Sequence, residues 1–150
     1  MKSYEHTQRG TFILVAMLGL AAGMSLLGWF ATKPLLIAVP ILVLAAWLFH
    51  SLTIEITGSE LHWRFGPGLI RKRIALADIA SICVVRTNFL EGWGIHLSRF
   101  GWLYNVSGFD AVAITLSNGR RFALGTDEPE ELLSKLKRNG STADVRPDGC

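Results

Sequence analysis

The chain has 150 residues, of which half are hydrophobic, and a formal net charge of +3 from 15 Lys and Arg against 12 Asp and Glu. This length allows one domain of ordinary size, or a smaller domain together with membrane segments. Nucleic-acid binding needs a larger, continuous basic patch than this net charge provides, so we expect no nucleic-acid partner.

Two uncharged apolar runs lie in the first third of the chain. As helices, residues 11–31 would span roughly 32 Å and residues 35–52 roughly 27 Å, close to the thickness of a bilayer core. Only three residues separate the runs, so they predict an antiparallel transmembrane hairpin over residues 11–52. Pro40 is expected to kink the second helix without ending it.

Two other interpretations of these runs are less favoured. A cleaved signal peptide has an apolar region of about 7–15 residues, which the first run exceeds, and a second apolar run follows at once. A soluble helical hairpin would need a polar stripe facing water, and neither run has one.

The first run also contains the spacing GLAAG, with Gly19 and Gly23 four residues apart. Small residues at this spacing allow close contact between membrane helices. The contact could be within the hairpin, against Ala38, Ala45 or Ala46, or between two copies of the chain. Both alternatives are open at this point.

The flanking charges predict the orientation of the hairpin. Lys2 and Arg9 lie in the expected N-terminal tail, residues 1–10, whereas the turn carries only Lys33. Arginines are frequent again after the second run, so we expect a multi-pass inner-membrane protein with both termini in the cytoplasm. Cys83 and Cys150 fit no disulfide or zinc spacing pattern, which suits a reducing compartment.

After the hairpin the hydrophobic pattern changes to the period of two that is typical of half-buried strands. Residues 52–57 and 61–65 alternate in this way, and residues 69–76 resume the pattern after a Gly-Pro-Gly turn. A further strand is expected at residues 81–87. The clearest hairpin covers residues 111–126, with Asn118-Gly119 supplying two residues that tolerate positive φ.

A helix is expected to end the β-domain, which we place at residues 53–139. Asp127 can cap the N–H of Glu130, Pro129 suits the first turn, and three leucines form an apolar stripe behind it. Gly140 would stop the helix. Residues 140–150 have no periodicity and are expected to form a flexible tail.

Several segments resemble the bacterial pleckstrin-homology-like (PH-like) domains of small membrane-anchored proteins. They are RFGPGLIRKRIALADIASI, GWGIHL and GWLYNVSGFDAVAITLSNGRRFALGTDEPEEL, within roughly residues 51–138. The resemblance implies a membrane-anchored α+β protein, in which two transmembrane helices precede a PH-like antiparallel β-barrel or sandwich capped by a C-terminal helix. Eukaryotic relatives often bind phosphoinositides through a basic motif between the first two strands. Here residues 57–60 contain no Lys or Arg, so that role is not carried over.

The aromatic stretch EGWGIHLSRFGWLYNVSG, residues 91–108, is a candidate surface. The favoured interpretation is packing, with Trp93, Ile95 and Leu97 alternating onto one strand face. The alternative places Arg99, Phe100 and Trp102 on a loop that touches lipid headgroups, where amphipathic aromatic side chains are enriched.

A basic run, Arg71-Lys72-Arg73, is the second candidate surface. Alternation places Arg71 and Arg73 on one strand face and Lys72 on the other. Each charge near an anionic bilayer contributes about 1 kcal/mol of attraction. A solvated strand edge that is protected by charge is slightly favoured over a lipid or partner site.

Chemistry finds little support in the sequence. His62 and His96 lie in alternating strand patterns with no carboxylate or thiol at metal-ligand spacing, so we expect no metal, no cofactor and no catalytic residue. The sequence therefore predicts a non-enzymatic interaction or scaffolding module at the inner membrane, which binds a protein partner or further copies of itself. The alternative is a sensor of anionic lipid headgroups.

Overall fold

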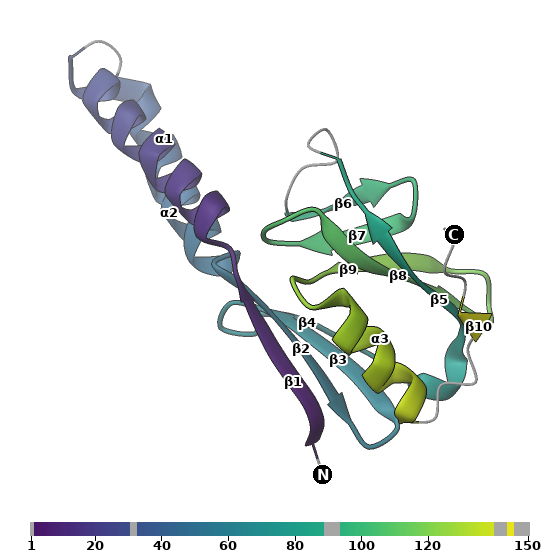
Figure 1. The fold of residues 1–150 in the computed structure, drawn as a ribbon. Coiled ribbons are helices and arrows are strands. Elements are labelled where there is room, and N and C mark those ends of the chain that lie inside the picture. Colours follow the sequence, from purple (N-terminus) through teal and green to yellow (C-terminus); the bar gives the residue numbers. More distant parts are fainter. Residues whose placement is uncertain (1, 31–32, 89–93, 140–143, 146–150) are drawn as a thin grey trace.

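The structure, a computed structural model, describes residues 2–30, 33–88, 94–139 and 144–145. It contains two β-sheets that face each other, a helix beside them, and a pair of helices that projects away from the sheets (Figure 1). The chain is therefore α+β, as expected.

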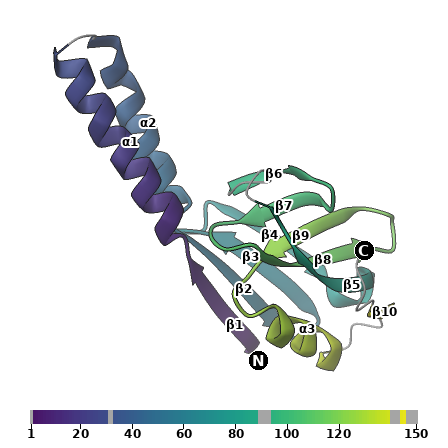
Figure 2. The same ribbon diagram turned by 45° about the horizontal axis from the view of Figure 1, so that its top comes forward.

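The projecting pair consists of α1 (Thr11–Phe30) and α2 (Ala38–Leu48), with a 3-10 turn, η1 (Lys33–Ile37), before α2. The two helices run side by side in both views (Figures 1 and 2). Within the described residues only α1 is long and apolar enough to cross a membrane, with a mean hydropathy of 2.1.

The expectation of two full-length spans is therefore wrong for the second helix. The α-helical part of residues 35–52 has 11 residues, about 16 Å, and the chain is already extended from Ser51 onward. Pro40 lies in the first turn of α2, where its missing N–H costs no hydrogen bond. It therefore lies at the beginning of the helix rather than at a kink within it.

The expected N-terminal tail is a strand. β1 (Lys2–Arg9) pairs antiparallel with β2 (Ser51–Thr57), in a register that runs from Arg9 opposite Ser51 to Lys2 opposite Thr57. Tyr4 and Gln8 are buried on the inner side of this strand. In the sequence, the helical pair thus lies between two strands that are neighbours in the sheet. Both helices connect to the sheet at the same end (Figure 1).

Sheet A has the order β1-β2-β3-β4, in which β3 is Glu60–Phe65 and β4 is Ile70–Ala75. These strands confirm the sequence pattern. Gly58 has positive φ in the β2–β3 turn, and Gly66 and Gly68 have positive φ in the β3–β4 turn. The amide of Gly66 donates to the carbonyl of Ser51, so this second turn lies at the base of the helical pair.

Sheet B has the order β10-β5-β8-β9-β7-β6. Its strands are β5 (Ile79–Arg86), β6 (Gly94–Ser98), β7 (Gly101–Asn105), β8 (Asp110–Leu116), β9 (Arg121–Gly125) and β10 (Asp144–Val145), and a short 3-10 turn, η2 (Leu76–Asp78), leads into β5. Neighbours are antiparallel except β7 with β9 and β10 with β5.

The ends of this sheet differ from two expectations. Asp144 and Val145 pair with β5 instead of belonging wholly to a tail, whereas 140–143 and 146–150 lie outside the described residues. The β8–β9 hairpin is confirmed, but of the two turn residues Asn118 and Gly119 only Gly119 has positive φ. β8 ends at Leu116 and β9 begins at Arg121, so the connection covers residues 117–120 instead of two residues.

The core lies between the two sheets, where Trp63 stacks on Phe122 with ring centroids 5.0 Å apart. In the part of the chain that the structure describes, the two sheets do not close into a barrel. The helix α3 (Pro129–Arg138) lies beside them and buries Leu132 and Leu136 against the core. Its position at the end of the domain is as the sequence predicts.

The cap of α3 differs from the prediction. The N-cap residue is Glu128, with no side-chain cap, and its amide donates to Oγ1 of Thr126. Asp127 instead lies 2.6 Å from Nε2 of His6, and Glu128 lies 3.1 Å from Nδ1 of the same ring. These two carboxylates connect the start of α3 to β1, a strand that the sequence analysis had not identified.

Candidate functional site

Sheet A has one face against the core and one face open to solvent, because successive side chains of a strand point to opposite sides. On β3, Trp63 and Phe65 are buried while His62 and Arg64 point outward. The open face carries positive charge, and we call it the cationic face. It consists of Thr53, Glu55, His62, Arg64, Arg71 and Arg73.

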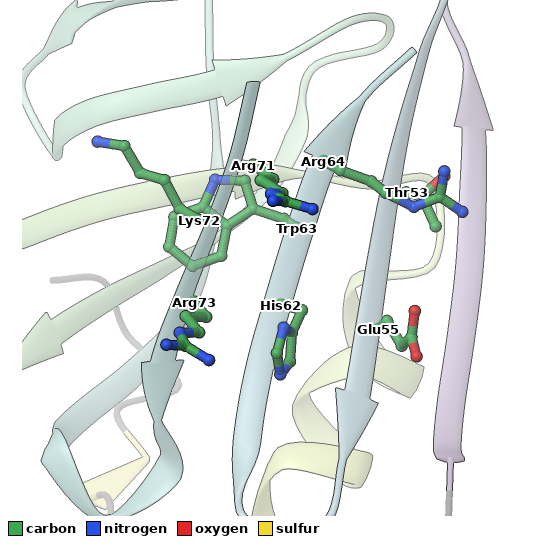
Figure 3. Close-up of a pocket in the computed structure, with 8 residues that line it drawn as sticks. All are labelled: Thr53, Glu55, His62, Trp63, Arg64, Arg71, Lys72 and Arg73. Atoms are coloured by element: carbon green, nitrogen blue, oxygen red, sulfur yellow. The ribbon is translucent and has the colours of Figure 1, made fainter. Parts of the chain in front are cut away.

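The strand register arranges these side chains in two rows. Thr53, Arg64 and Arg71 are successive partners across β2, β3 and β4. Glu55, His62 and Arg73 form the next row in the same way (Figure 3). Together with Trp63 and Lys72 they line an open groove of about 610 Å³. As predicted, Arg71 and Arg73 share a face, and Lys72 extends in the opposite direction (Figure 3).

The positive charge of the cationic face is only partly compensated. Nη2 of Arg64 lies 3.9 Å from Oε1 of Glu5, a loose and exposed pair that contributes little. Among the described residues neither Arg71 nor Arg73 has an ion pair or a side-chain hydrogen bond. Arg64 and Arg71 are also direct cross-strand partners, an unfavourable pairing of like charges. The β4 side of this face can therefore bind an anionic group.

Lys72 belongs to the inner side of β4. Its Nζ donates to the hydroxyl of Tyr104 at 2.8 Å and lies 5.3 Å from the centre of the Tyr104 ring. This contact connects the edge of sheet A to β7 of sheet B. The ammonium group is held in place there and does not add to the cationic face.

The other tentative site residues do not join Arg71 and Arg73. Nη2 of Arg99 donates to the carbonyl of Arg86 at 2.9 Å, and its guanidinium lies 4.7 Å from the centre of the Phe100 ring. Phe100 packs against a cluster that includes Leu103, on the outer face of sheet B. Arg99 and Phe100 both lie in the turn between β6 and β7, and contact of this turn with lipid headgroups stays a prediction. Trp93 lies outside the described residues.

Trp102 differs from its neighbours because half of its surface is exposed. It lies two residues from Tyr104 on β7, so both side chains are on the inner face of sheet B. Tyr104 is buried there, whereas Trp102 extends beyond the part of this face that sheet A covers.

A second groove lies where the helical pair leaves sheet A. It is lined by Thr7, Arg9, Thr11, Leu14, His50 and Ser51. It adjoins the cationic face, because Oγ1 of Thr7 lies 2.9 Å from Oγ1 of Thr53. The sequence analysis missed it because Arg9 was assigned to a tail. The alternation of Tyr4, His6 and Gln8 was the available signal.

Gly19 and Gly23 do not pack against α2. A Cβ atom built on either residue meets no other atom within 4 Å, whereas Ile13, Ala21 and Gly28 are the buried residues of α1. Packing within the hairpin is therefore not their role. Contact between two copies stays a prediction.

Cys83 corrects another expectation. It is fully buried and disulfide-bonded. A reducing compartment therefore does not follow from the cysteines.

The described part of the chain contains no cluster of three His, Cys, Asp or Glu side chains able to hold a metal ion. Both ring nitrogens of His6 face carboxylates, an arrangement that holds β1 against α3.

Comparisons with protein-family models, with curated proteins and with solved structures find no match.

Proposed function

We propose that this protein is a membrane-anchored, PH-like interaction module without enzymatic activity, and that its cationic face binds an acidic segment of a partner protein. The observation that carries the proposal is the pair Arg71 and Arg73, two cations on one sheet face with no acidic partner among the described residues. Such a face attracts acidic partners and orients them as they approach.

The exposed apolar surface of the helical pair supports the anchor. On α1 the exposed side chains include Leu20, Leu26, Trp29 and Phe30, a larger apolar surface than a soluble monomer usually exposes. The pairing of β1 with β2 argues against a cleaved signal peptide, because cleavage after α1 would remove a strand of sheet A. We propose that the helical pair enters the bilayer as a unit.

The side of the membrane is proposed from charge. Lys2 and Arg9 on one side of α1, against Lys33 in the turn, favour a β-domain in the cytoplasm of a cell with an inner membrane. The disulfide at Cys83 favours the opposite, oxidising side. Alkylation of the unfolded chain without reductant decides between them: on the cytoplasmic side both cysteines are modified, and on the other side neither is.

A second candidate function, the sensing of anionic lipid headgroups, is favoured by the groove at the base of the helical pair. Arg71 lies level with Thr53, roughly 7 Å along the strand from Ser51, and Arg73 lies roughly 13 Å from it. Arg9, which pairs with Ser51, and Arg71 therefore both lie close enough to the base of the helical pair to contact a lipid headgroup. Arg73 lies roughly 7 Å farther from the helical pair than Arg71, which favours a protein partner.

Binding of fluorescent polyglutamate to the full chain in nanodiscs tests the proposal. In zwitterionic discs the double variant Arg71→Gln/Arg73→Gln should bind roughly 5- to 30-fold more weakly, because two exposed ion pairs contribute about 1–2 kcal/mol together. Lys137→Gln/Arg138→Gln removes the same charge from α3 and should change affinity little. Equal weakening by both double variants would contradict a specific role for the cationic face.

The same measurement in anionic discs separates the two candidate functions. The anionic disc repels the polyglutamate probe equally for the wild-type chain and for the Arg71→Gln/Arg73→Gln variant. The ratio of the two affinities is therefore the informative quantity. A ratio that persists supports a protein partner. A ratio that falls to about one indicates that lipid headgroups already occupy the cationic face, and it supports the headgroup sensor.

A further inference from the structure

The strand β4 is an open edge of sheet A. Within the described residues it pairs with β3 on one side and with no strand on the other. An unpaired edge presents a row of backbone N–H and C=O groups to which another extended chain can hydrogen-bond. The charges of Arg71, Lys72 and Arg73 protect this edge against general pairing and restrict it to a chain with complementary acidic residues. Leu69, an exposed residue of the β3–β4 turn, directly precedes β4.

On the outer side of this edge an added strand would lie beside Arg71 and Arg73. The two residues are separated by one position and point to the same face, roughly 7 Å apart along the strand. Acidic side chains at alternate positions of an added strand have the same spacing. The outer side therefore selects an acid at every second position.

On the inner side an added strand would meet apolar surface of sheet B. Leu97 on β6 is 73% exposed and Trp102 on β7 is 50% exposed, and the two residues are direct cross-strand partners. Ile95 and Tyr104, two positions along from each, already pack against the core below sheet A. Leu97 and Trp102 thus continue the inner face beyond the region that sheet A covers.

The contact of Lys72 with Tyr104 brings β4 close to β7, the strand that also carries Trp102. Nζ of Lys72 donates to the Tyr104 hydroxyl. Figure 3 shows the Lys72 side chain extending past the free side of β4. A strand that added to β4 would therefore have cations on its outer side and Trp102 and Leu97 on its inner side. The added strand must therefore alternate acidic side chains, which face the cations, with apolar side chains, which face Trp102 and Leu97.

We propose that β4 receives an extended segment of a partner protein as a fifth strand of sheet A, and that acidic and apolar residues alternate in this segment. The inference rests on the proposed function and specifies the partner of the cationic face. Backbone hydrogen bonds to β4 hold the segment, and the two faces select its sequence.

Synthetic peptides test the added strand with the full chain in zwitterionic nanodiscs. The probe is an eight-residue peptide of alternating Glu and Val, and the control has the same composition in two blocks. We expect the alternating peptide to bind at least about tenfold more tightly. Equal binding of the two peptides would overturn the fifth strand, while the cationic face would stand as proposed.

Backbone methylation identifies the edge contact. The alternating peptide is methylated on all Glu nitrogens in one version and on all Val nitrogens in the other, so that the N–H groups on one edge are removed at a time. One version should lose at least about tenfold in affinity and the other much less. Unchanged binding of both versions would overturn pairing with β4.

Two variants complete the test. Trp102→Ala should weaken binding of the alternating peptide several-fold and leave polyglutamate binding unchanged, whereas Phe109→Ala, an exposed aromatic residue on another loop, should change neither. Unchanged peptide affinity in Trp102→Ala would overturn the inner-side contact. Binding of polyglutamate alone would refute only the fifth strand, and binding of neither probe would refute the proposed function as well.

Discussion

Replacing Gly66 by alanine should separate backbone strain from steric conflict at the junction of the helical pair and sheet A. Gly66 has φ +44°, and a Cβ atom there would lie 2.6 Å from the carbonyl oxygen of Leu48 and 3.0 Å from that of Trp47. Gly119 has φ +80°, and a Cβ atom there would meet nothing within 4 Å. The two glycines share the backbone conformation and differ in their surroundings.

The expected magnitudes follow from this difference. Alanine in the left-handed region costs about 1 kcal/mol at either position. At Gly66 the last turn of α2 must also move, and overpacking of this kind costs about 1–3 kcal/mol more. We therefore expect Gly66→Ala to lower the free energy of unfolding by about 2–4 kcal/mol, and Gly119→Ala by about 1 kcal/mol.

Thermal unfolding of the full chain in detergent, followed by near-UV circular dichroism, measures this difference. For a domain of this size 1 kcal/mol corresponds to roughly 4–8 °C in Tm. Gly58→Ala is a second control, because Gly58 has φ +59° and open space around it. Equal shifts for all three variants would refute a close contact between the β3–β4 turn and α2.

Three further predictions concern the anchor and β1. Leu20→Arg, in the exposed apolar surface of α1, should impair insertion by about 2.5–3.5 kcal/mol, and normal recovery in the membrane fraction would contradict the span. Burial and the nearby Glu128, Glu131 and Asp127 carboxylates raise the pKa of Tyr4, so the folded state holds the neutral phenol and stability should fall as the pH rises above about 10. Tyr4→Phe should abolish that decline and raise stability at pH 7 by up to about 1 kcal/mol, because the buried hydroxyl has no hydrogen-bond partner among the described residues. An unchanged alkaline decline would count against this prediction. His6→Ala should speed amide exchange in β1 at a cost below about 1 kcal/mol, and unchanged exchange would show that the contacts with Asp127 and Glu128 do not hold the strand.

Much of the fold follows from local patterns. The apolar run predicts α1, and alternation predicts β2, β3 and β4 because a strand with one buried face must repeat with a period of two. Asn118-Gly119 marks the β8–β9 turn for a similar reason, since Gly119 adopts the positive φ that glycine tolerates best. The position of Arg71 and Arg73 on the same face of β4 follows from the same period of two.

Long-range contacts decided the rest. In the segment KSYEHTQR the alternation of Tyr4, His6 and Gln8 is a weak signal, because Tyr4 alone of the three is hydrophobic. Contacts with β2 and with the carboxylates of α3, more than 40 residues away, make the segment β1. The same is true of Arg9, which belongs to a groove only because β1 ends at the helical pair, and of Trp102, whose exposure depends on where sheet A ends. Sequence patterns report on neighbours along the chain, whereas the edges of sheets and the surfaces beside them are set by segments that meet only in the folded protein.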